Sequence, residues 1–181
     1  MDSADETVRV FFALWPSSQG RALLAGWQDK LKPLCRGRAM RPDSLHATLV
    51  FLGEVGKSRL EALQLAALEV EFDAFELSFD TARYWGHNHI VFAAPGNVPA
   101  QLLNLVGNLE QSLRRHTFHF ESRPYKPHVT LLRNAQWSDA ELPTLPVANW
   151  ECSDFVLVQS INDGRAGHYE VLGRFAASAL K

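Results

Sequence analysis

The stretch LHATLVFL at residues 45–52 is echoed about eighty positions later by PHVTLL at residues 127–132. Both contain the pattern His-x-Thr-Leu, which begins at His46 and again at His128. Because successive side chains of a β-strand point to opposite faces, the histidine and the threonine of each motif share one face. The intervening residue and the leucine then face apolar packing. Each motif therefore predicts a strand that presents an imidazole beside a hydroxyl group.

Two such pairs are suited to chemistry at a phosphodiester. Hydrolysis needs the attacking oxygen deprotonated and the leaving oxygen protonated, and histidine, with a reference pKa of about 6.5, holds either state near neutral pH. The threonine hydroxyls of both motifs can donate to the non-bridging oxygens. Arg133 offers a planar fork for the same oxygens, although a surface arginine at a strand end is an equal interpretation. A single histidine on a strand is more often structural, so the repetition carries the functional prediction.

Alternating strand and helix patterns predict an α+β protein. A hairpin with its tip at residues 86–88 joins two of the strands, and Ser17 or Ser18 is placed to cap the first helix. The order strand, helix, strand recurs after residue 90, and no linker separates independent domains. The expected strands are 8–14, 45–52, 75–80, 83–85, 89–93, 128–132, 155–161 and 169–175, and the expected helices are 17–33, 58–68 and 99–115.

Composition indicates a folded protein of one domain. The chain has 181 residues, of which 46% are hydrophobic and 21% charged, which excludes intrinsic disorder. Its formal net charge of −2 disfavours a protein that grips a long nucleic acid, because that mode of binding depends on many phosphate contacts. A small or local phosphate ligand remains compatible with this charge.

The cysteines and the N-terminus give expectations about location. Cys35 and Cys152 are far apart and too few for a disulfide framework. The N-terminus begins acidic, unlike a secretory signal, and no run of about 18 apolar residues occurs. We therefore expect a soluble, cytoplasmic monomer that needs no membrane and no obligate protein partner.

The repeated motif and its flanks resemble a known group of enzymes. Two His-x-Thr-Leu motifs about eighty residues apart resemble the two-histidine phosphoesterase superfamily. The segments FFALWP at 11–16, LHATLVFLGE at 45–54 and RPYKPHVTLLR at 123–133 are similar to the bacterial RNA 2′,3′-cyclic phosphodiesterases, also called 2′-5′ RNA ligases. The similarity spans the chain from residue 8 to about residue 175.

This resemblance implies a bilobal α+β fold with a pseudo-twofold relation. Each lobe would be an antiparallel sheet with outer helices, in one domain over residues 1–181, and the cleft between the lobes would hold the active site. The resemblance implies that His46, Thr48, His128 and Thr130 are catalytic, with Arg133 as a phosphate ligand and no metal or other cofactor. It implies that His128 acts as base on water and His46 as acid to the departing 3′ oxygen, although the sequence is nearly symmetric in the two sites.

The implied substrate is RNA, or a nucleotide, that ends in a ribose 2′,3′-cyclic phosphate, opened to a 2′-phosphate; a reversible 2′-5′ ligation is a second implied activity. Tyr125 is the better candidate to stack on a base, whereas Phe12, like Phe11, fits core packing better. Arg123 and Lys126 are candidate RNA contacts. Two basic runs flank the motifs, formed by Arg114, Arg115, Arg123, Lys126 and Arg133 and by Arg36, Arg38 and Arg41.

Other interpretations are weaker. His87 with His89, or His116 with His119, has the spacing of paired metal ligands, but neither pair has a convincing third ligand nearby. A serine hydrolase is disfavoured because no Gly-x-Ser-x-Gly elbow occurs, and glycine-rich phosphate loops are absent from the sequence. The alternative from another class is a non-catalytic module that binds RNA ends or nucleotides in the same cleft.

Overall fold

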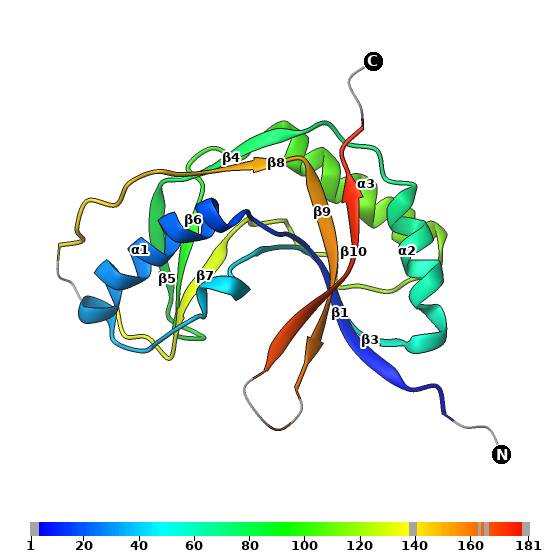
Figure 1. Ribbon diagram of the computed structural model, residues 1–181, viewed down its shortest axis with the longest axis horizontal. Coiled ribbons are helices and arrows are strands. Elements are labelled where there is room, and N and C mark those ends of the chain that lie inside the picture. The colour runs from blue at the N-terminus through cyan, green and yellow to red at the C-terminus, as the bar shows by residue number, and fades with distance from the viewer. Residues whose placement is uncertain (1–3, 138–140, 163, 165–166, 179–181) are drawn as a thin grey trace.

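Two four-stranded antiparallel sheets organise the protein (Figure 1), and the computed structural model describes residues 4–137, 141–162, 164 and 167–178. Each sheet carries one of the two motifs and combines strands from distant parts of the chain. The first sheet has the order β10-β9-β1-β3, with β1 at Thr7–Leu14, β3 at Ala47–Gly56, β9 at Asp154–Ile161 and β10 at His168–Ala176. The second has the order β2-β7-β6-β5, with β2 at Arg38–Ala39, β5 at Thr81–Trp85, β6 at Ile90–Ala94 and β7 at Val129–Arg133.

A third, two-stranded sheet and three α-helices complete the architecture. The small sheet pairs β4, Phe75–Phe79, with β8, Ala148–Cys152. Helix α1, Ser18–Cys35, packs beside β7, whereas α2, Leu60–Leu68, and α3, Ala100–Arg115, pack on each other and beside the first sheet. Short 3₁₀ turns at Pro42–Ser44 and Lys57–Arg59 lead toward β3 and α2. No helix in the described part of the chain is long and apolar enough to cross a membrane.

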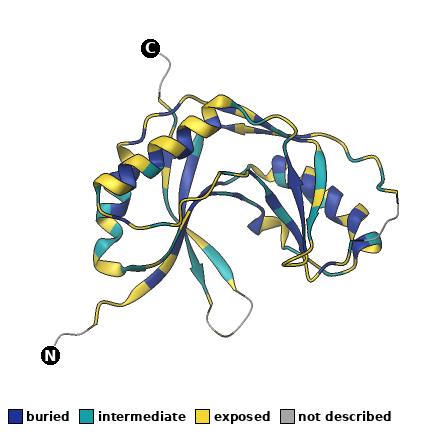
Figure 2. Cartoon of the chain, turned by 180° about the vertical axis from the view of Figure 1, so that it is seen from behind, coloured by how far each residue is buried: buried dark blue, intermediate teal, exposed yellow. Residues whose placement is uncertain are grey.

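The helices cover the outer sides of the sheets. In Figure 2 the buried residues of the helices form stripes facing the sheets, and the exposed residues face away from them. Such stripes are expected when an amphipathic helix buries its apolar face on a core. The α+β class and the antiparallel sheets with outer helices predicted for this chain are therefore present in the structure.

The main differences from the predicted elements lie at their ends. The predicted strands at 45–52 and 128–132 begin at Ala47 and Val129, so each motif histidine immediately precedes its strand. Helix α1 continues past Pro33 to Cys35, where the backbone turns at Arg36, with φ of 54°. Ser17 caps this helix, because its hydroxyl oxygen accepts a hydrogen bond from the Gly20 amide at 3.2 Å. The short strands β2 and β8 were not predicted.

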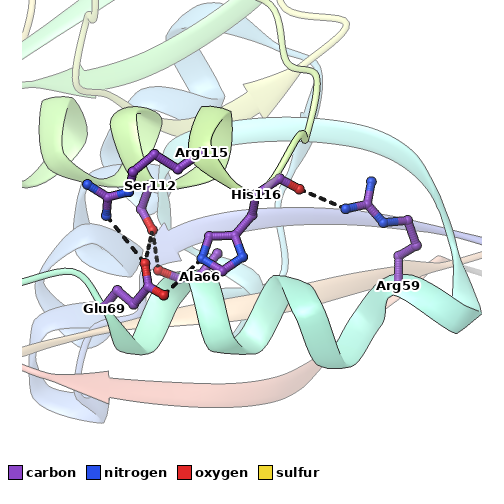
Figure 3. A network of polar contacts seen from close by, with 6 residues as sticks. All are labelled: Arg59, Ala66, Glu69, Ser112, Arg115 and His116. Atoms are coloured by element: carbon purple, nitrogen blue, oxygen red, sulfur yellow. Dashed lines mark hydrogen bonds and ion pairs between the residues drawn. The ribbon is translucent and has the colours of Figure 1, made fainter.

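A polar network joins α2 to α3 away from both motifs. Glu69 accepts hydrogen bonds from Arg115 at 3.3 Å and binds the His116 ring at 2.9 Å, while the buried Ser112 hydroxyl donates to the Ala66 carbonyl at 2.7 Å (Figure 3). These contacts hold the pKa of the Glu69 carboxyl below its usual range, chiefly through the hydrogen bond from His116. His116 is thus part of a helix–helix contact.

Candidate active site

A cleft of about 420 Å³ lies between the two large sheets. It is lined by both histidines and both threonines of the repeated motif, His46, Thr48, His128 and Thr130, and by Arg133. The fold thus brings together in one cleft the five residues predicted as its centre, although the motifs lie about eighty residues apart in the sequence. Arginines but no Asp or Glu stand among the described residues of this lining, so the cleft attracts an anion in a protein of net charge −2.

Both histidines are fixed to the backbone in the same way. The Nδ1 atom of His46 lies 2.7 Å from the Ser44 carbonyl oxygen, and the Nδ1 atom of His128 lies 2.9 Å from the Lys126 carbonyl oxygen. A carbonyl oxygen only accepts, so Nδ1 must carry the proton in each ring. In the neutral ring, Nε2 is then the free acceptor. Each ring can take up or release a proton at Nε2 while its orientation is held at Nδ1.

Aromatic rings surround His46 on the first sheet. Its ring lies 5.0 Å from Phe11, 5.3 Å from Tyr169 and 5.7 Å from Trp15, measured between centroids, and it is stacked on Trp15. Behind Trp15, the guanidinium carbon of Arg21 lies 4.8 Å from the indole ring. His46 is therefore held between an aromatic wall and the cleft, with a cation one layer behind.

A smaller aromatic set surrounds His128 on the second sheet. Its ring meets Trp85 edge-on at 4.6 Å and Phe92 edge-on at 5.6 Å between centroids. Trp85 and Phe92 come from the neighbouring strands β5 and β6 and lie 4.0 Å apart. These rings pack against the imidazole and restrict its orientation.

An irregularity in β7 turns Arg133 toward the cleft. Alternation along a regular strand would put Arg133 and His128 on opposite faces, because they are five residues apart. Thr130 pairs with Phe92 and Leu132 pairs with Val91, so Leu131 is an extra residue between them. Such a β-bulge shifts the alternation by one residue. Arg133 therefore shares the face of the histidine and threonine of its motif.

Buried contacts hold this bulge in place. The Gln28 side chain of α1 is buried, and its Nε2 atom donates to the Leu131 carbonyl at 3.0 Å and to the Met40 carbonyl at 2.8 Å. Gly37, at φ of 83°, passes so close that an added Cβ would lie 2.6 Å from the Arg133 carbonyl oxygen. The position of Arg133 thus depends on a buried amide and on a glycine that leaves room for its backbone.

Burial and nearby charge set the proton affinity of His46. Its pKa lies at about 4, below the ordinary value, mainly because burial penalises the charged ring. The hydrogen bond to Ser44 opposes this shift, whereas the positive charges of His128, Arg21 and Arg133 lower the pKa further. At neutral pH the free protein therefore holds this ring without its second proton.

Burial also lowers the pKa of His128, and the hydrogen bond to the backbone carbonyl opposes the shift. Burial and this hydrogen bond are the main causes of the shift at His128, whereas positive charges also act on the pKa of His46. Both rings are neutral at rest near pH 7. A bound phosphate anion would favour the charged form of either ring, because opposite charges at close range stabilise each other.

The predictions for base and RNA contacts are only partly matched. Phe12 was named as a candidate for base contact although core packing was favoured for it. Base contact is wrong and core packing is right, because Phe12 is fully buried in the main core, on the opposite side of β1 from Phe11. Tyr125 packs against the core, and its hydroxyl donates to the Thr48 carbonyl at 3.0 Å, which supports the first motif from behind. Burial raises the pKa of Tyr125 well above its ordinary value.

Arg123 and Lys126 line a second hollow next to the cleft, the outer hollow, of about 550 Å³; its lining also includes Phe51, Trp85 and Asn88. Arg123 donates to Glu121 at 2.7 Å, so its charge is partly neutralised. Of the basic runs, Arg38 and Arg41 border a smaller hollow of about 290 Å³ beside the cleft. Arg114 and Arg115 instead pair with Glu110 of α3 and with Glu69, which follows α2.

The histidine pairs considered as metal ligands have other contacts. His116 binds Glu69, and the Nδ1 atom of His89 lies 2.9 Å from the Tyr84 hydroxyl oxygen. Among the described residues, no group of three or more His, Cys, Asp or Glu side chains is placed to hold a metal ion.

Several residues of the cleft were not predicted from the sequence. Trp85 and Asn88, at the end of β5 and in the turn that follows, reach the cleft, and so do Tyr169 of β10 and Phe11 and Arg9 of β1. Phe11 was expected in the core, but the uniformly apolar run FFAL gives no alternation that separates its two faces. Their places depend on the pairing of distant strands, which no local pattern reports.

Known proteins resemble this chain in sequence and in fold. The sequence profile of the family described as LigT like Phosphoesterase matches residues 14–92 and again residues 91–166. The chain is 32% identical to the RNA 2′,3′-cyclic phosphodiesterase of Escherichia coli K12, over 94% of this chain and 97% of that protein. It is 29% identical to the protein of the same name from Thermus thermophilus, over 93% and 90% of the two chains.

Among solved structures, the crystal structure of E. coli LigT complexed with 3′-AMP superposes with a TM-score of 0.85 at 30% sequence identity. The match covers 96% of this chain and all of the LigT chain.

Proposed function

The chain belongs to the LigT-like phosphoesterase family, and we propose that it hydrolyses a terminal ribose 2′,3′-cyclic phosphate of RNA to a 2′-phosphate. The observation that carries this proposal is the pair of histidines in one cleft, each anchored at Nδ1 to the carbonyl two residues before it. That arrangement supplies two proton-transfer groups with fixed orientation. The curated relatives, named RNA 2′,3′-cyclic phosphodiesterases, give the substrate class.

In the proposed reaction the two rings act on opposite sides of phosphorus. Nε2 of His128 takes a proton from water as the water oxygen forms a bond to phosphorus, and the bond from phosphorus to the 3′ oxygen breaks. Nε2 of His46 gives its proton to that oxygen, which leaves as the 3′ hydroxyl, while the phosphate stays on the 2′ oxygen. One water is consumed, and a proton returned from His128 to His46 through solvent resets the site.

The threonines and Arg133 would hold the phosphate during this step. Hydroxyl donors of Thr48 and Thr130 and the guanidinium of Arg133 surround the space between the rings. Donors fixed before the reaction stabilise the charge that grows on the non-bridging oxygens without having to reorganise. The five-membered cyclic phosphate is strained, so two imidazoles suffice for both proton transfers.

Under this assignment His46 must gain a proton before it can act as acid. Its pKa of about 4 leaves the ring neutral in the free protein at pH 7. The substrate phosphate brings the negative charge that favours the charged ring. A ring with a low pKa is also a strong acid, which suits protonation of a poor leaving group such as an alkoxide. Substrate binding and loading of the acid are therefore coupled.

The test uses a nucleoside 2′,3′-cyclic phosphate, with a chelator present, and compares the wild type with His46→Ala and His128→Ala. We expect turnover by the wild type and a loss of about 100- to 10,000-fold in kcat for either variant. His119→Ala, at an exposed histidine outside the cleft, is the matched control and should keep the wild-type rate. A thermal melt checks that every variant is folded.

Absence of turnover by the folded wild type would overturn the proposal. If the wild type then still bound the nucleotide, the alternative of a non-catalytic RNA-end module would take its place. Analysis of the product separates a 2′-phosphate from a 3′-phosphate. A 2′-5′ ligation activity is tested in the same way, with an added RNA that carries a 5′ hydroxyl.

A further inference from the structure

A second arginine lies directly across from Arg133. Strands β2 and β7 pair antiparallel, and Arg38 of β2 is the partner of Arg133. Side chains directly opposite on paired antiparallel strands lie on the same face, with Cβ atoms about 5 Å apart, and like charges so placed repel each other. Among the residues that the structure describes, no Asp or Glu forms an ion pair with either arginine. An anion bound across the two strands would relieve this repulsion.

Arg38 borders a hollow that is continuous with the cleft. This hollow of about 290 Å³, the basic hollow, contains Arg38 and Arg41 in its wall. The residues that it shares with the cleft are Met40, Ser44, Ser160 and Tyr169. Its wall holds no Asp or Glu in the described part of the chain. A chain of phosphates that begins at Arg133 therefore passes from one arginine to the next without meeting a carboxylate.

Both arginines of the basic hollow are accessible to a ligand. Arg38 is exposed on the short strand β2. The Nη2 atom of Arg41 donates to the Gly167 carbonyl at 3.2 Å, which ties its guanidinium to the residue before β10. Its Nε atom lies 3.9 Å from Asp43, but both side chains are more than half exposed, so this ion pair contributes little. The planar forks of the two arginines match the geometry of phosphate oxygens.

Two other hollows border the cleft and fit a phosphate chain less well. The outer hollow contains Glu110 and Glu121 in its wall, and Arg123 there already donates to Glu121. A hollow of about 410 Å³ shares only Trp85 and His128 with the cleft, so it reaches the cleft at the opposite end of β7 from Arg133. A carboxylate repels a phosphate, and the basic hollow is therefore the best exit for an RNA whose last phosphate lies at Arg133.

We propose that the basic hollow binds the phosphodiester on the 5′ side of the terminal nucleotide, with Arg38 as its main contact and Arg41 beside it. This inference rests on the proposed function. With the cyclic phosphate at Arg133 and the preceding phosphate at Arg38, the paired strands β2 and β7 hold two successive phosphates of one RNA. The protein then prefers the end of an RNA to a free nucleoside 2′,3′-cyclic phosphate, which has no second phosphate.

The test compares three substrates. They are cytidine 2′,3′-cyclic phosphate, the dinucleotide that adds one cytidine through a 5′ phosphodiester, and the same dinucleotide with a neutral methylphosphonate in place of that phosphodiester. For the wild type we expect KM of the charged dinucleotide to be about tenfold below that of the other two, because a hydrogen bond between charged groups replaces contacts with water. Its log(1/KM) should also fall more steeply with log salt concentration, by about 0.7 per added phosphate contact.

Arg38→Gln should remove both differences while kcat, and KM for cytidine 2′,3′-cyclic phosphate, stay within twofold of the wild type. Arg38→Lys keeps the charge without the fork and should recover part of the preference for the charged dinucleotide. Arg114→Gln removes one positive charge from α3, outside the cleft, and is the matched control that should change none of the three KM values. A thermal melt checks that each variant is folded.

Three results would overturn the inference. The first is a wild type with the same KM for the charged and the neutral dinucleotide. The second is an Arg38→Gln variant whose KM rises equally for all three substrates, because Arg38 would then only shape the cleft around Arg133. The third is a preference lost in Arg123→Gln and kept in Arg38→Gln, which would place the RNA in the outer hollow. None of them touches the proposed function, which fails only if the wild type turns over none of the substrates.

Discussion

His46 and His128 stand in the same motif, yet the protein surrounds them differently. Each has Nδ1 fixed by a backbone carbonyl two residues back, and each precedes a strand with a bulge after its threonine. His46, however, is packed against Phe11, Trp15 and Tyr169 with a cation behind them, whereas His128 meets two rings edge-on. The repeated sequence provides two histidines that are held in the same way, and their surroundings make them unequal.

The proposed reaction makes use of this inequality. If both histidines had identical surroundings, nothing would decide which one takes the proton from water and which one gives a proton to the leaving oxygen. A lower proton affinity at His46, together with a phenylalanine at its fifth position and an arginine at that of His128, distinguishes the two sides of the cleft. Under the proposed mechanism the neighbours of each motif therefore set the two roles, and substitutions among those neighbours should alter them.

The largest effect on activity is expected when Arg133 of the second motif is replaced by phenylalanine, the residue at the equivalent position of the first motif. Arg133→Phe removes the guanidinium that we propose binds the phosphate, and we expect kcat/KM to fall about 100-fold for a nucleoside 2′,3′-cyclic phosphate. Arg133→Lys keeps the charge but not the bidentate geometry and should recover only part of the loss. Steady-state kinetics of the two variants measures this. Full activity in Arg133→Phe would show that Arg133 does not bind the phosphate.

A smaller effect is expected on stability in acid. A histidine whose pKa is lowered in the folded state binds its proton more readily when unfolded, so its contribution to stability is complete above pH 6.5 and is lost as the pH falls toward 4. Between pH 6.5 and 4, the free energy of unfolding of His46→Gln should therefore fall by about 2 kcal/mol less than that of the wild type. Urea denaturation at both pH values checks this. His128→Gln should reduce this loss of stability in acid by a smaller amount, since fewer charges act on the pKa of that ring. An equal reduction in both variants would contradict the difference between the sites.

The smallest effect concerns the cation behind Trp15. The guanidinium of Arg21 lowers the pKa of His46, so Arg21→Met should raise that pKa from about 4 toward its ordinary value, by roughly half a pH unit. The Nε and Nη2 atoms of Arg21 are buried without a hydrogen-bond partner in the described structure, so methionine can replace the side chain at little polar cost. NMR titration of the histidine rings measures the change. An equal shift at His128 would mean that the whole cleft had changed.

Much of this arrangement could be predicted from the sequence. The strand signals, the helix periodicities and the two His-x-Thr-Leu motifs are local patterns, and they led to the α+β class and to the five central residues of the cleft. Even there the strands begin one residue after the histidines, and each histidine ring is hydrogen-bonded to the carbonyl two residues back, outside the strand.

The rest depends on contacts between distant segments. The bulges at Leu49 and Leu131 follow from the register of neighbouring strands, and they decide that Phe51 and Arg133 face the cleft. Phe12 and Phe11 are adjacent and chemically alike, so only the packing of β1 shows that one is in the core and the other beside His46. Strand register and the side of a strand that faces the core are set by tertiary packing, and a local sequence pattern does not report them.

The central claim is that two copies of one motif carry opposite proton transfers, with His46 as acid and His128 as base. The most direct measurement replaces the bridging 3′ oxygen of the cyclic phosphate by sulfur, because a thiolate, with a pKa near 8.5 for its thiol, leaves without a proton. We predict that the loss in rate of His46→Ala relative to the wild type is at least about tenfold smaller on this substrate than on the oxygen substrate, and that the loss of His128→Ala is unchanged. Recovery in His128→Ala instead, or equal losses in both variants, would contradict the account.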